Sequence, residues 1–107
     1  METVILGLPT CDTCRKARKA LPQARFRDIR AEPLNSDELA ELLERFGERL
    51  VNRASATWRG LPEAERQNSP RILLAAHPAL MKRPVIRQGH VLYLGWGPDE
   101  RSALGVS

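Results

Sequence analysis

The sequence predicts an α/β fold in which helices flank a small mixed sheet of four strands, and three observations support this. Thr3–Leu6 is a short β-branched and apolar run closed by Gly7, which is typical of a buried strand. Apolar residues at helical spacing fill the middle of the chain. A Gln88-Gly89 turn between two further β-type runs predicts a hairpin. The expected order is therefore strand, helix, strand, several helices, hairpin and a last helix.

The first part of the chain is expected to form a strand–helix–strand unit. After the first strand, Thr10 is positioned to cap a helix that runs to about Leu21. Pro22 stops this helix, because proline lacks the N–H that a helix interior needs. Ala24–Ile29 is the expected second strand.

The later helices carry clear boundary signals. Asn35 and Glu38 occupy the two positions of a capping box, and Gly47 follows the apolar stripe of this helix. Ser69-Pro70 is the start of another helix, which must end near His77-Pro78. The remaining expected elements are a helical turn after Leu61-Pro62, strands at Pro84–Arg87 and His90–Leu94, and a helix opened by Pro98.

Both cysteines of the chain, Cys11 and Cys14, lie where the first strand meets the first helix. A C-x-x-C motif beside a strand–helix–strand pattern is typical of the thioredoxin-like fold. At a helix N-terminus, backbone N–H groups and the helix dipole stabilise a thiolate at Cys11, and Arg15, Lys16 and Arg18 add positive charge. Cys14 lies one turn further on the same face, so it is a candidate resolving thiol for a mixed disulfide on Cys11.

Two other uses of the cysteine pair remain open but are disfavoured. A structural zinc site needs about four ligands, and only His77 and His90 are available to complete C-x-x-C. A structural disulfide is uncommon in the reducing cytoplasm. Thiol redox chemistry is therefore the preferred interpretation, and no metal site is expected.

Composition and charge narrow the function classes. The chain has 107 residues and a formal net charge of +4, and this length predicts one domain. No apolar run is long enough for a membrane span, and no secretory signal precedes Thr3–Leu6, so the expected location is the cytoplasm.

Aromatic residues make up 5% of the chain, too few for a base-stacking surface, so direct nucleic-acid binding is not expected. With no exposed apolar stripe evident, a monomer is expected.

Three blocks of the sequence, "LPTCDTCRKARKAL", "LVNRASATWRGL" and "LLAAHPALMKRPVI", carry a resemblance that spans almost the whole chain. In their order they resemble signature blocks of the arsenate reductase/Spx (ArsC-like) family, and most of all its small YffB-like thiol reductases. The resemblance implies a single thioredoxin-like domain over residues 1–107, with a helical insertion at roughly 34–80 between the second and third strands. It also implies that Cys11 is the catalytic cysteine and that a cis Pro84 holds Arg83 beside it.

The arginines of a family oxyanion site are only partly matched. Arg83 is placed to lower the pKa of Cys11 and to bind an oxyanion or carboxylate in a bidentate manner. Arg53 is the candidate second arginine, although the family position counted back from Trp58 falls on Ala54. The third is expected after the hairpin, where this chain reads Leu94-Gly95-Trp96-Gly97, so strong arsenate reduction is not expected. Solvated surface positions for Arg53, Arg59, Lys82 and Arg83 are the alternative.

Together these patterns select a small set of candidate residues. The candidate catalytic residues are Cys11, Cys14 and Arg83, and the candidate substrate-binding residues are Thr10, Arg15, Arg53 and Pro84.

Two functions follow from the resemblance. The preferred one is a thiol-dependent reductase acting on a disulfide or oxyanion, with glutathione as co-substrate, or with glutaredoxin or thioredoxin as reductant, and with no tightly bound cofactor. The alternative is an Spx-like, redox-switched transcriptional regulator that binds the RNA polymerase α subunit. The intact Cys11/Cys14 pair fits the regulator, whereas the end of the chain at Ser107, without a longer basic segment, favours the reductase.

Overall fold

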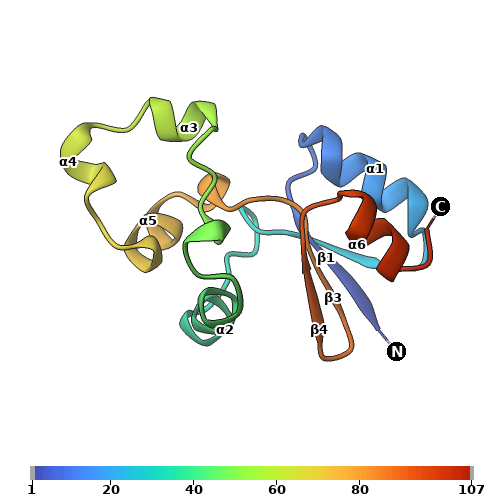
Figure 1. Ribbon diagram of the computed structural model, residues 1–107. Coiled ribbons are helices and arrows are strands. Elements are labelled where there is room, and N and C mark those ends of the chain that lie inside the picture. Colours follow the sequence, from blue (N-terminus) through green and yellow to red (C-terminus); the bar gives the residue numbers. More distant parts are fainter. Residues whose placement is uncertain (1, 107) are drawn as a thin grey trace. The chain divides into compact units, whose positions relative to one another are not determined.

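The computed structural model describes residues 2–106, which form two compact units, residues 2–29 with 83–106 and residues 30–82 (Figure 1). None of the helices within residues 2–106 has the length and apolar character that a membrane span requires. The elements are β1 (Thr3–Gly7), α1 (Asp12–Ala20), β2 (Arg25–Asp28), α2 (Ser36–Phe46), η1 (Gly47–Leu50), α3 (Ala56–Arg59), α4 (Glu63–Arg66), α5 (Pro70–Ala76), η2 (Pro78–Leu80), β3 (Val85–Gln88), β4 (Val91–Leu94) and α6 (Pro98–Ala103).

The first unit is built on a four-stranded mixed sheet with the order β2-β1-β3-β4. β1 pairs in parallel with β2 and antiparallel with β3, and β3 pairs antiparallel with β4. The parallel pair needs a crossover, which α1 provides, whereas β3 and β4 are joined by a tight turn. This sheet with its flanking helices confirms the predicted thioredoxin-like class.

One face of the sheet is covered by α1 and α6, which lie beside each other in Figure 1. A row of apolar side chains crosses this face, because the register aligns Phe26, Ile5, Ile86 and Tyr93 on neighbouring strands. Ile5, Ile86 and Ala17 of α1 are fully buried at its centre, with relative exposures of 0%. Burial of such side chains, at about 25 cal/mol per Å² of apolar surface, anchors α1 to the sheet.

The hairpin differs slightly from its prediction. Gln88 belongs to β3 rather than to the turn, because it pairs with Val91 and donates a side-chain hydrogen bond to Thr3 Oγ1 at 3.2 Å. The turn therefore lies at Gly89-His90, where Gly89 adopts a φ of 62° that suits glycine.

The second unit holds α2 to α5, and its presence confirms the predicted helical insertion between the second and third strands. The capping box is formed as expected: Asn35 Oδ1 accepts from the Glu38 N–H at 2.8 Å, and Glu38 Oε1 accepts from the Asn35 N–H at 2.9 Å. Gly47 ends α2 with a φ of 59°. The predicted start at Ser69 and end at His77 of α5 are also confirmed.

Replacing Asn35 with Ala should lower the free energy of unfolding by about 1 kcal/mol, because the first turn of α2 loses its side-chain acceptor. Urea titration followed by circular dichroism measures this. Asn68→Ala, at an exposed position before α5, is the matched control and should leave the midpoint unchanged. Equal midpoints for the two variants would contradict the stabilising role of the capping box.

Candidate active site

Cys11 occupies the N-cap of α1. Its N–H donates to the Leu8 carbonyl at 3.1 Å, and its own carbonyl accepts from the Arg15 N–H at 3.0 Å, which is the first bond of the helix. The prediction that Thr10 caps this helix is wrong, because Thr10 lies inside the turn closed by the Cys11–Leu8 bond. The Cys11 side chain is half-buried, and its position at the N-cap places its sulfur at the positive end of α1.

The antiparallel pairing of β3 with β1 brings Arg83 to the cysteine. Val85 lies opposite Leu6, so Arg83, two residues before Val85, is level with the start of the loop that leads to Cys11. The Arg83–Pro84 peptide bond is cis, as the family resemblance implies, and Pro84 is buried. The Arg83 side chain hydrogen-bonds the Cys11 sulfur.

The surroundings of Cys11 favour its thiolate. Burial raises the pKa of the Cys11 thiol, but hydrogen bonds from the Cys14 backbone N–H, the Cys14 thiol and the Arg83 guanidinium lower it. The positive charge of Arg83 lowers it further, and the net pKa lies below the ordinary value. Cys11 therefore combines partial exposure with thiolate character, as a nucleophile requires.

Cys14 has the opposite environment. It is fully buried in α1, and burial, followed by the hydrogen bond and the charge of the Cys11 thiolate, raises the pKa of Cys14 to about 12. The Leu8 backbone N–H and the Arg83 charge act in the other direction without reversing the shift. In the reduced protein Cys14 is thus a neutral thiol that donates a hydrogen bond to Cys11.

The basic side chains of α1 do not face the thiolate as expected from the sequence. Arg15 is exposed and donates from Nε to the Pro9 carbonyl at 3.0 Å, so it braces the loop before Cys11. Lys16 lies 3.8 Å from Asp12, and the Arg18 guanidinium lies over the Phe26 ring, 4.1 Å from its centroid. The charge that lowers the Cys11 pKa comes from Arg83 instead.

Thr10 and Pro84, two candidate substrate-binding residues, directly precede Cys11 and directly follow Arg83 in the chain. Thr10 is exposed, and Pro84 is fully buried. Their contact with a substrate stays a prediction.

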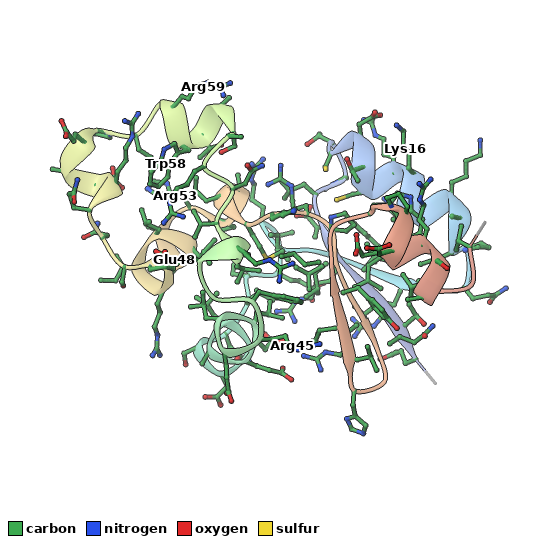
Figure 2. The ribbon with its side chains drawn as sticks, in the orientation of Figure 1. Lys16, Arg45, Glu48, Arg53, Trp58 and Arg59 are labelled. Carbon is green, nitrogen blue, oxygen red and sulfur yellow. The ribbon has the colours of Figure 1, made fainter. Side chains whose placement is uncertain are left out.

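Arg53 lies in the second unit and is engaged there (Figure 2). Its Nη2 atom is 3.2 Å from Glu48 Oε1, and its guanidinium lies over the Trp58 ring at 5.2 Å from the centroid. Arg66 lies over the same ring at 5.7 Å and donates from Nε to the Trp58 carbonyl at 3.2 Å. Substrate binding by Arg53 stays a prediction.

The described part of the chain contains no group of side chains arranged to bind a metal ion. Residues 2–106 hold no group of three or more His, Cys, Asp and Glu side chains that could bind an ion. His77, a ligand considered for zinc, has its Nε2 atom 2.5 Å from Glu65 Oε1 in the second unit.

Sequence reasoning missed the part that Gly7 plays in this site. The sequence marks Gly7 only as the end of a strand, whereas in the structure Gly7 faces Cys14 across the junction of β1 and α1. A Cβ atom at position 7 would overlap the Cys14 Sγ. The signal available in the sequence was a glycine four positions before Cys11, at the end of a buried strand.

Comparisons with known proteins show the family and support the fold of the chain. A model of the ArsC family matches residues 6–104. The solved structure of a YffB protein, 31% identical, has a TM-score of 0.84 and covers 94% of this chain and 96% of that one. The solution structure of an arsenate reductase (ArsC) related protein from Brucella melitensis is 36% identical, with a TM-score of 0.75 and coverage of 96% and 93%. The global transcriptional regulator Spx of Bacillus subtilis is 30% identical over 102 residues, 86% of this chain and 78% of that protein.

The two cysteines should differ in the pH at which they are alkylated. Alkylation follows the thiolate fraction, so Cys11, with its lowered pKa, should react at lower pH than an ordinary thiol, and Cys14, with a pKa of about 12, should lag far behind. Mass spectrometry of the reduced protein after timed iodoacetamide treatment resolves the two sites. Coincident pH profiles would contradict the assigned environments.

Arg83→Ala should raise the pKa of Cys11, because the sulfur loses both a hydrogen bond and a positive charge. At a fixed pH below that pKa, alkylation of Cys11 should become slower. Lys19→Ala removes one exposed positive charge from α1 and is the matched control. The role of Arg83 is refuted if both variants titrate like the unchanged protein.

Proposed function

Because the chain belongs to the ArsC family, we propose that it is a thiol-dependent reductase in which Cys11 is the nucleophile and glutathione is the electron donor. The observation that carries this proposal is the environment of Cys11: a half-buried sulfur at a helix N-cap, hydrogen-bonded by Arg83 and Cys14, with a lowered pKa. Such a thiolate is suited to attack on sulfur.

The proposed first step is attack of the Cys11 thiolate on a disulfide, R–S–S–R′. A bond forms between Cys11 Sγ and one sulfur, the S–S bond breaks, and R′–S⁻ leaves and takes a proton from water. A glutathione thiolate then attacks the Cys11 sulfur and releases R–S⁻. A second glutathione thiolate releases Cys11 as a thiolate and departs as glutathione disulfide, so two glutathiones are oxidised for each disulfide reduced.

Cys14 offers a second route from the mixed disulfide. Once Cys11 Sγ is bonded to another sulfur it carries no charge, so the two effects of Cys11 that raise the pKa of Cys14 are removed. Cys14 can then lose its proton to water, attack Cys11 Sγ and expel R–S⁻. This leaves a Cys11–Cys14 disulfide, which two glutathiones reduce.

The charge distribution suits an anionic co-substrate. The first unit holds nine Lys and Arg against five Asp and Glu, whereas the second unit holds eight of each, so the net charge of +4 belongs to the unit with the cysteines. Glutathione carries two carboxylates, and the net positive charge of the first unit attracts them toward the part of the chain that holds Cys11. The reducing glutathione pool of the cytoplasm also fits this role, and we propose that compartment.

A disulfide is the preferred substrate over arsenate. Arg83 hydrogen-bonds Cys11 and carries a positive charge beside it, so it is the candidate ligand for an oxyanion there. Residues 94–97, where a third oxyanion arginine is expected, contain no basic side chain, and Arg53 is engaged by Glu48. A single guanidinium is a weaker basis for arsenate binding than the set of arginines that the family resemblance implies.

An Spx-like regulator is the second candidate function. The observation in its favour is the pairing of a C-x-x-C motif with 30% identity to the Spx of Bacillus subtilis. In that case the Cys11–Cys14 disulfide would act as a redox switch, and another surface would bind the RNA polymerase α subunit.

Cys11→Ser should reduce glutathione-dependent turnover of bis(2-hydroxyethyl) disulfide to the uncatalysed rate, whereas Cys14→Ser should keep measurable turnover through the glutathione route. A coupled glutathione reductase assay measures both. Undiminished turnover of Cys11→Ser would refute the reductase. The regulator is favoured instead if the protein is inactive and binds purified polymerase α subunit in its oxidised form, with binding lost in Cys14→Ser.

A further inference from the structure

We propose that Gly7 is a positioning residue: because it has no side chain, it lets the sulfur of Cys14 lie against Cys11. Its importance for turnover rests on the proposed function, since only dithiol chemistry needs the two sulfurs together. Its effect on the pKa values of Cys11 and Cys14 does not depend on the proposed function and can be measured without a substrate.

Backbone conformation does not explain the glycine at this position. Gly7 is the last residue of β1, pairs with Asp28 of β2 and is buried. Its carbonyl accepts the Ile29 N–H at 3.0 Å. The glycines with positive φ in residues 2–106 are Gly47, Gly89, Gly95 and Gly105, so Gly7 has a conformation open to any residue.

The packing around position 7 explains why a glycine is needed there. A Cβ atom built at position 7 would overlap the Cys14 Sγ, far closer than real Cβ contacts. Its other neighbours are at ordinary distances, 3.4 Å to the Cys14 Cβ and 3.6 Å to Phe26 Cε1. The space where a side chain would begin is therefore taken by one atom, the sulfur of the second cysteine.

An added methyl group would displace the sulfur more readily than the strand. β1 is hydrogen-bonded to β2 on one side and to β3 on the other, and moving it would disturb both pairings. The Cys14 Sγ is the end of a side chain that turns about one bond, and a helical residue has two accessible rotamers for that bond. Rotation takes the sulfur off β1 and away from its hydrogen bond with Cys11.

The displacement of the Cys14 sulfur should raise the pKa of Cys11 and lower the pKa of Cys14. Cys11 loses the Cys14 hydrogen bond that helps to lower its pKa, and Cys14 loses the neighbouring thiolate that helps to raise its own. The displaced sulfur is also further from the position needed to attack Cys11 Sγ, so the internal disulfide becomes harder to form. A residue that only stabilised the fold would leave these properties unchanged.

The test compares Gly7→Ala, Cys14→Ala and the double variant with the unchanged protein. Equilibration in glutathione buffers, followed by acid quenching and mass spectrometry, gives the equilibrium constant for the Cys11–Cys14 disulfide. Gly7→Ala should lower the equilibrium constant for forming the Cys11–Cys14 disulfide about tenfold or more, as expected for a methyl group inserted into filled space. It should also shift alkylation of Cys11 to higher pH and that of Cys14 to lower pH.

The double variant shows whether the sulfur is the atom concerned. The double variant should have the same alkylation profile of Cys11 and the same urea midpoint as the Cys14→Ala single variant, because the atom that a Cβ at position 7 would overlap is gone. Gly60→Ala is the matched control: a Cβ there meets only the Ala56 and Thr57 carbonyl oxygens at 3.5 and 3.6 Å, and it should alter none of the readouts.

Unchanged disulfide constant and alkylation profiles in Gly7→Ala would overturn the proposal. If Gly7→Ala does not fold, the double variant decides: folding restored by Cys14→Ala supports the proposal, and failure of the double variant overturns it. All these readouts are independent of turnover. A protein that responds as expected but reduces no disulfide refutes the reductase and leaves the positioning role of Gly7 standing.

Discussion

The hydrogen bonding of β1 to a strand on each side is the constraint on which the site depends. Because β2 and β3 fix this strand, its end at Gly7 is fixed too, and a short turn places Cys11 at the start of α1. The same pairing sets the start of β3 beside that turn and so delivers Arg83. The Cys11 sulfur and the Arg83 guanidinium, 72 positions apart in the chain, meet because of strand order.

The two sulfurs illustrate how one local structure gives identical side chains different chemistry. One turn of helix separates them, yet Cys11 stands at the end where N–H groups are open, and Cys14 is buried against β1. The negative charge on one sulfur raises the pKa of the other, so their protonation states are linked. Loss of the negative charge on Cys11 is therefore expected to lower the pKa of Cys14.

What the sequence made predictable was mostly local. The capping box at Asn35 and Glu38 and the start of α5 at Ser69 are encoded within a few residues, and both were predicted correctly. The proximity of Arg83 to Cys11 depends on strand pairing, and it was expected only through family resemblance. The contact of Gly7 with Cys14 depends on how closely α1 packs on β1, which no spacing pattern records.

The sheet order also bears on self-association. β2 and β4 are the edge strands, and each has only four residues, which limits the backbone groups they offer to another chain. If two molecules joined antiparallel at this edge with Phe26 opposite Phe26, Arg25 of one copy would lie opposite Arg27 of the other, and like charges directly opposite each other are destabilising. The two arginines of β2 therefore disfavour this pairing of two copies, so a backbone edge that is open in the sheet is protected by its side-chain charge.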